Sequence, residues 1–91
     1  MSIEFTPDEW YDPHRRQVVW FSAVDDEKVI QCGISIEALV ENFGAFADDP
    51  LTAFRGHRER IWQCAGRFIA ERRFEDDGTI LIRSADLPLT A

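Results

Sequence analysis

The sequence predicts a small α+β domain, and three observations carry this prediction. The chain has 91 residues, 45% hydrophobic and 30% charged, a balance typical of a folded domain and too apolar for a disordered chain. Short β-branched and aromatic runs lie in its first third and near its end. A long segment between them has helical periodicity. We therefore expect a bent antiparallel sheet of about four strands, in the order β-β-β-α-α-β, packed against one long and one short helix.

The first strands are expected before residue 35. Ile3-Glu4-Phe5 alternates and predicts a short strand, whereas residues 6–16 contain two prolines and predict a loop. Residues 17–24 are β-branched and aromatic on both faces, which is typical of a central strand. Residues 28–34 alternate, and the short acidic turn before them predicts an antiparallel hairpin.

Two helices are expected next. Ser35 is a favourable N-cap for a helix over residues 36–43, and Gly44 is a natural terminator. Asp49 and Pro50 predict the start of a second helix that runs to about residue 73. Its apolar side chains fall in one arc that should pack on the sheet: Leu51, Phe54, Ile61, Trp62, Ala65, Phe68 and Ile69.

The C-terminal part completes the expected domain. Residues 79–83 predict the last strand, after a turn that contains Gly78. Residues 84–91 contain a proline and should form a loose tail. Since no linker, repeat or low-complexity tract interrupts the chain, residues 1–91 are expected to form a single domain, which is too short for a barrel or a full dinucleotide-binding fold.

The charges are unevenly distributed. The formal net charge is −7, yet residues 50–73 hold six arginines against two glutamates. The surface should therefore be dipolar, with one basic element on an acidic protein. Nucleic-acid binding is not expected, because these arginines project around most of the helix and the total charge repels phosphate.

The chain start and the hydropathy favour a cytoplasmic protein. The first residues lack a basic start followed by a long apolar core, so no secretory signal is expected. The longest nearly apolar run, residues 18–24, is too short to span a bilayer, so no membrane contact is expected.

The cysteines and histidines do not form a recognisable site. Cys32, Cys64, His14 and His57 match a zinc site in number but not in spacing. His57 and Cys64 lie two helical turns apart, too far for a direct nucleophile–base pair. Both thiols are expected to be reduced, with Cys32 in the core and Cys64 at the border of the apolar stripe of the long helix. Without a catalytic motif we expect no metal, no cofactor and no enzymatic activity.

Arg58 departs from the apolar pattern, because it falls inside the buried arc of the long helix. A buried guanidinium needs a partner or must extend to solvent. One interpretation is a structural salt bridge to Glu37 or Glu41 on the first helix. The other is an anchor for a small anion or ligand, shared with the neighbouring Arg55 and His57.

Trp10 and Tyr11 lie in the expected loop and also allow two interpretations. They could fold back over an open end of the core, or they could form an exposed aromatic contact for a partner.

Several segments, taken in order, resemble an uncharacterised family of bacterial proteins, the domain-of-unknown-function family 1488. The resemblance covers residues 3–84 and rests on Ile3-Glu4-Phe5 with Trp10 and Asp12, Val18-Val19-Trp20-Phe21, residues 32–39, Phe43-Gly44, and residues 54–58 with Ile61 and Ala65. It implies a compact α+β domain of bacterial origin. The family has no assigned activity, so the resemblance implies no site residues.

Two classes of function follow from these patterns. The first is a non-catalytic interaction or accessory module with an acidic surface and an unidentified partner, for which a protein is one candidate. The alternative is a regulatory protein that binds a small anion or ligand through Arg55, His57 and Arg58.

Overall fold

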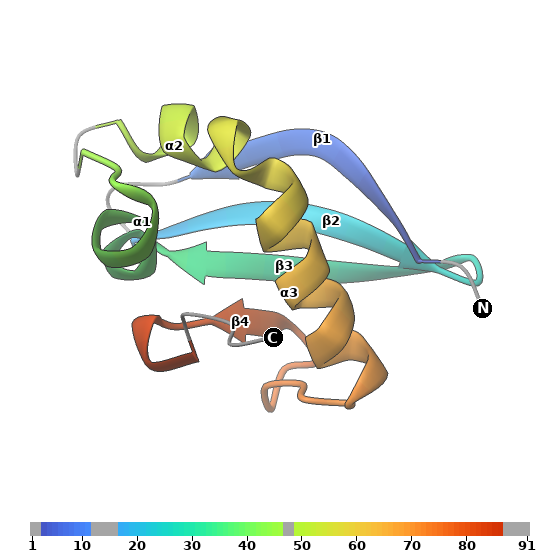
Figure 1. Cartoon of the computed structure of the whole chain (residues 1–91). Helices are drawn as coiled ribbons and strands as arrows, with labels where there is room; N and C mark the ends of the chain where they lie inside the picture. The colour runs from blue at the N-terminus through green and yellow to red at the C-terminus, as the bar shows by residue number, and fades with distance from the viewer. Residues whose placement is uncertain (1–2, 12–16, 47–48, 87–91) are drawn as a thin grey trace.

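The computed structural model describes residues 3–11, 17–46 and 49–86. Its elements, in chain order, are β1 Ile3–Tyr11, β2 Val18–Asp25, β3 Lys28–Ser35, α1 Ile36–Phe43, α2 Pro50–Gly56, α3 Arg58–Ala70, β4 Ile80–Ile82 and the 3₁₀ helix η1 Ser84–Asp86. The strands form one sheet in the order β1-β2-β3-β4, and α3 crosses it (Figure 1). The predicted α+β class is confirmed.

The sheet is mixed rather than antiparallel. β1, β2 and β3 pair antiparallel, which confirms the predicted hairpin. β4 instead lies parallel to β3, with Cys32 opposite Ile80. The expectation of an antiparallel last strand was wrong, because the helical connection returns the chain to the end of the sheet where β3 begins.

β1 is longer than the sequence predicted. The expected three-residue strand continues to Tyr11, through part of the expected loop. Its pairing with β2 shifts between Thr6 and Trp10, around Pro7. An edge strand tolerates a proline at such an irregularity, since the missing amide is not needed for the ladder. Residues 12–16, which include His14, lie outside the described residues.

The expected long helix is divided in two. α2 ends at Gly56, and the amide of His57 donates to the carbonyls of Ala53 and Phe54, both at 3.1 Å. α3 then begins at Arg58 in a different direction (Figure 1). The apolar stripe concealed this break, because Phe54 and Ile61 are buried on both sides of it.

α3 also ends earlier than predicted, at Ala70 rather than near residue 73. Arg72 adopts a positive φ of 57°, and the amide of Arg73 donates to the carbonyl of Phe68 at 2.9 Å. The amide of Arg72 donates to the carbonyl of Ile69 at 3.1 Å. These two bonds form a Schellman ending, a role that glycine usually fills.

The caps of α1 were predicted correctly. The Ser35 hydroxyl accepts from the amide of Ala38 at 3.0 Å, and Gly44 takes the left-handed conformation that ends the helix.

The prediction of a loose tail over residues 84–91 was wrong at its start. Residues 84–86 form η1, where the Asp86 carboxylate accepts from the amide of Arg83 at 3.0 Å. Residues 87–91 lie outside the described part of the chain.

One hydrophobic core lies between the sheet and the helices. β2 contributes Val19, Phe21 and Ala23, all fully buried. Phe54 from α2 packs on Phe21 with ring centroids 5.1 Å apart. Ile61 and Phe68 from α3 are buried as predicted. We call this side of the sheet the covered face and the opposite side the open face, because no helix in the described ranges packs on it.

Candidate functional site

Arg58 pairs with a carboxylate that the sequence analysis did not consider. Its Nη2 lies 2.7 Å from Oε1 of Glu9 on β1, and the Glu9 side chain is only 1% exposed. Arg55 also donates to this oxygen, at the longer distance of 3.4 Å. The expectation of Glu37 or Glu41 as partner was wrong, because β1 extends far enough to place Glu9 on the covered face beneath α2 and α3.

The surroundings of this pair are partly apolar. The Arg58 guanidinium lies 5.7 Å from the centre of the Trp62 ring, one turn further along α3. Glu9 Oε2, Arg58 Nε and Trp62 Nε1 are buried and find no hydrogen-bond partner among the described residues. A buried carboxylate of this kind requires its cation, which points to a structural role for Arg58.

The predicted trio of Arg55, His57 and Arg58 is only partly brought together. The two arginines converge on Glu9. His57 caps the junction between α2 and α3 and packs against the Phe43 ring, 5.0 Å between centroids. Arg55 keeps 56% of its side chain exposed, against 30% for Arg58. Arg55 is therefore the member of the trio that solvent reaches most easily.

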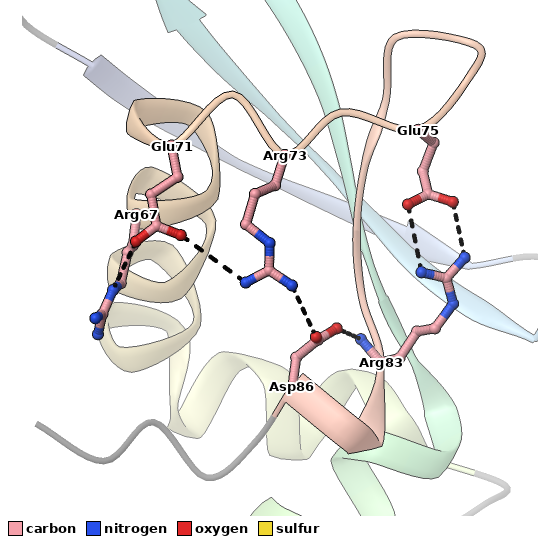
Figure 2. Close-up of polar contacts among 6 residues, drawn as sticks. All are labelled: Arg67, Glu71, Arg73, Glu75, Arg83 and Asp86. Atoms are coloured by element: carbon pink, nitrogen blue, oxygen red, sulfur yellow. Dashed lines mark hydrogen bonds and ion pairs between the residues drawn. The ribbon is translucent and has the colours of Figure 1, made fainter.

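A second polar cluster holds the C-terminal segment against α3 (Figure 2). It consists of three arginines and three carboxylates: Arg67, Glu71, Arg73, Glu75, Arg83 and Asp86. Arg73 bridges to Asp86 of η1 at 3.1 Å and lies over the Phe68 ring at 4.0 Å. The cluster neutralises much of the positive charge at the end of α3.

Glu75 and Arg83 form the shortest pair of this cluster. The guanidinium donates to both carboxylate oxygens, at 2.7 and 3.3 Å (Figure 2). The hydrogen bond from Arg83 lowers the pKa of Glu75, and the same bond raises the pKa of Arg83. Both groups therefore stay charged through the neutral range.

Neither cysteine is arranged for nucleophilic chemistry. Cys32 and Cys64 are free and buried. Burial raises the pKa of Cys32 to about 12. Burial, with a smaller contribution from Asp86, raises the pKa of Cys64 to about 11. Both are neutral thiols at physiological pH, whereas a reactive cysteine needs a lowered pKa.

The open face presents an aromatic pair on β1 and β2. Trp10 and Trp20 are opposite each other on β1 and β2, with ring centroids 6.5 Å apart. Trp20 lies across Gly33 of β3, where a Cβ atom would come within 2.9 Å of its ring and within 2.6 Å of Val18. Gly33 thus lets the indole lie close to the sheet. Trp10, 52% exposed, is the outermost part of this pair.

A shallow depression lies beside the aromatic pair. Its volume is about 530 Å³, and Val18 and Leu81 contribute its apolar lining. The loop before β4 contributes Glu75, Asp76 and Asp77. Since Leu81 is opposite Gly33 in the β3–β4 pairing, the depression belongs to the open face.

Trp10 and Tyr11 therefore point to opposite sides of β1. Tyr11 packs against the core, as the fold-back interpretation expected. Trp10 is exposed on the open face, as the partner-contact interpretation requires. The sequence alone did not separate them, because it predicted a loop where the structure has a strand that sends alternate side chains to opposite faces.

No group of three or more His, Cys, Asp or Glu side chains in residues 3–11, 17–46 and 49–86 is arranged to hold a metal ion. Within the same ranges, no helix has the length and hydropathy needed to cross a bilayer.

Together these features define a small two-layer α+β protein, with a mixed sheet covered by helices on one face. The family described as "Protein of unknown function (DUF1488)" matches residues 3–82, and the chain belongs to this family. The crystal structure of a family member from Shewanella loihica PV-4, also described as a protein of unknown function, is 25% identical and superposes with a TM-score of 0.81. The match covers 89% of this chain and 91% of that one. No curated protein matches the sequence.

Proposed function

We propose that this protein is a non-catalytic interaction module that binds a protein partner through its open face. The observation that carries the proposal is the Trp10–Trp20 pair on a face that no described helix covers, with Trp10 exposed and Trp20 half-buried beside it. Tryptophan is enriched among the residues that dominate binding energy at protein interfaces. The apolar lining of the adjacent depression extends this surface towards Leu81.

The chemistry of the other candidate groups supports a binding role rather than catalysis. Both thiols have raised pKa values, so neither is a thiolate near pH 7. The acidic and basic groups near the end of α3 pair with one another, an arrangement that stabilises structure. An exposed aromatic pair needs no such chemistry to contribute to binding.

The proposal is tested by affinity capture with a matched pair of variants. Trp10→Ser removes the exposed indole from the open face, and Val40→Ser removes an exposed apolar side chain from α1. Proteins captured by the wild type are identified, purified and titrated against all three forms. We expect Trp10→Ser to weaken binding by about tenfold or more, and Val40→Ser to leave it unchanged. Equal binding by both variants would refute the proposal.

A second candidate function remains, which is anion binding at Arg55. The exposed Arg55 guanidinium and its long contact to Glu9 favour it. Titration of phosphate and of acetate, followed through the Arg55 Nε–H resonance by NMR, tests it with Arg55→Gln as the control. A saturable shift, or recovery of the protein alone with a small anion, would support this candidate over the first.

A further inference from the structure

The open face has two kinds of surface in a defined arrangement. Its centre is apolar and contains Trp10, Trp20 and the depression lined by Val18 and Leu81. Gly33 has no side chain, so Val18 and the Trp20 ring pack directly over it and form the apolar surface next to Leu81. The centre therefore suits an apolar side chain of moderate size from a partner.

Carboxylates lie on both sides of this apolar centre. On β1, Glu4 is opposite Val24, and both share the side of the sheet that carries Trp10 and Trp20. Asp8 is exposed on the same strand. Beyond β4, Asp76 lines the depression and is exposed. Arg83 also lines the depression, but its guanidinium is paired with the Glu75 carboxylate, so the two charges offset each other. The arginines of residues 50–73 lie on the helical side instead.

This charge arrangement selects among partners. A nucleic-acid strand could stack on the tryptophans, but its phosphates would be repelled by the carboxylates on both sides. The open face of a second copy carries the same charges and would be repelled as well. A cationic protein segment gains favourable electrostatics at both edges and apolar contact at the centre.

We infer that the open face binds a protein segment in which an apolar side chain is flanked by lysines or arginines. The apolar side chain contacts Trp20 and occupies the depression near Leu81. The flanking cations face Glu4 on one side and Asp76 on the other. This inference rests on the proposed function and specifies the chemistry of the partner.

The test uses defined probes rather than the natural partner. Two short fluorescein-labelled peptides have leucines at the same positions. All remaining positions are lysine in one peptide and glutamate in the other. A labelled oligothymidylate of similar length is the third probe. Fluorescence anisotropy against the full chain measures each dissociation constant. We expect the lysine peptide to bind at least about tenfold more tightly than the other two probes.

Two charge-matched double variants locate the interaction. Glu4→Gln with Asp76→Asn removes two exposed carboxylates from the open face, and Glu37→Gln with Glu59→Gln removes two from α1 and α3. Both variants change the net charge equally. We expect the open-face variant to weaken lysine-peptide binding by roughly fivefold, and the helix variant to change it less than about twofold.

The inference is overturned if the lysine and glutamate peptides bind equally, if neither binds, if the oligothymidylate binds most tightly, or if the two double variants behave alike. Its failure differs from failure of the proposed function. A captured partner that depends on Trp10 but docks through a neutral or acidic segment would retain the proposed function and overturn only the partner chemistry. A captured partner indifferent to Trp10→Ser would overturn both.

Discussion

The two faces of the sheet differ although the same strands form them. Along β2, Val19, Phe21 and Ala23 are fully buried on the covered face. The neighbouring Trp20, equally apolar, is only partly buried on the open face. Alternation along a strand assigns each side chain to a face, but the placement of the helices decides which face becomes core. Apolar character in β2 is therefore divided between folding and a surface available for binding.

The charges follow the same division. On the helical side, Arg58 pairs with the buried Glu9, and Arg73 pairs with Asp86. These cations stabilise the attachment of α3 to β1 and η1. The open face instead presents Glu4 and Asp76 at its edges, both exposed. The predicted basic element is thus mainly a structural feature, and the acidic surface is the one that lies beside exposed aromatic rings.

The largest expected effect is on the covered face. Phe54→Ala removes a fully buried ring that packs on Phe21, and should lower the free energy of unfolding by about 3–5 kcal/mol. Urea denaturation followed by circular dichroism measures it. A loss below about 1 kcal/mol would show that the covered face is not the main source of stability.

The buried ion pair gives the next largest effect. Arg58→Met leaves the Glu9 carboxylate buried with only the distant Arg55, and should destabilise the protein by about 2–3 kcal/mol. Adding Glu9→Gln should recover part of this loss, since it removes the uncompensated charge. Urea denaturation of both single variants and the double variant forms the cycle. If Arg58→Met unfolds with wild-type stability, Arg58 is not a structural partner.

A substitution at Gly33, on the open face, should lower the stability less than the two substitutions above. Gly33→Ala places a Cβ within 2.6 Å of Val18 and 2.9 Å of the Trp20 ring, so both side chains must move. We expect a loss of about 1–2 kcal/mol together with a change in the near-ultraviolet circular dichroism of the tryptophans. Wild-type stability with unchanged tryptophan signals would contradict the close packing of Trp20 on β3.

The buried thiols predict a loss of stability at alkaline pH. Burial raises the pKa of Cys32 from 9.0 to about 12, so the unfolded chain ionises first as the pH rises. The stabilising contribution is complete below pH 9.0 and is lost towards pH 12. At pH 10 we expect about 1 kcal/mol less stability from this thiol. Cys32→Ala should reduce this pH slope in urea titrations.

Much of the fold could be predicted from the sequence, because its signals are local. The β2–β3 hairpin follows from a short turn between apolar runs, and the ends of α1 follow from Ser35 and Gly44. The parallel pairing of β4 could not be predicted, because it depends on where three helices return the chain. The helix break at His57 could not be predicted from the helical spacing of apolar residues, since Phe54 before it and Ile61 after it are both buried.

The candidate site was less predictable. Arg58 was identified correctly as the polar residue in an apolar arc, but its partner was not. Glu9 is on the same side of β1 as Phe5 and Tyr11, and this period of two becomes visible only once β1 is known to continue past Pro7. Trp10 was identified as one of two contact candidates, and the prediction that Trp20 lies in a central strand is confirmed. The pairing of the two indoles on one face was not predicted, because the sequence does not state which face the helices leave uncovered.

The smallest effect on stability is expected at Trp10 on the open face. It tests most directly whether the open face, unlike the covered face, is dispensable for folding. Trp10→Ser removes a side chain that is already 52% exposed, so the free energy of unfolding should change by less than about 0.5 kcal/mol. Trp20→Ser should cost more, about 1–2 kcal/mol, because Trp20 covers Gly33 and Val18. Thermal and urea denaturation of both variants measure the difference. If Trp10→Ser destabilises the protein as much as Trp20→Ser, the outer indole is needed for folding, and its exposure no longer argues for a surface reserved for binding.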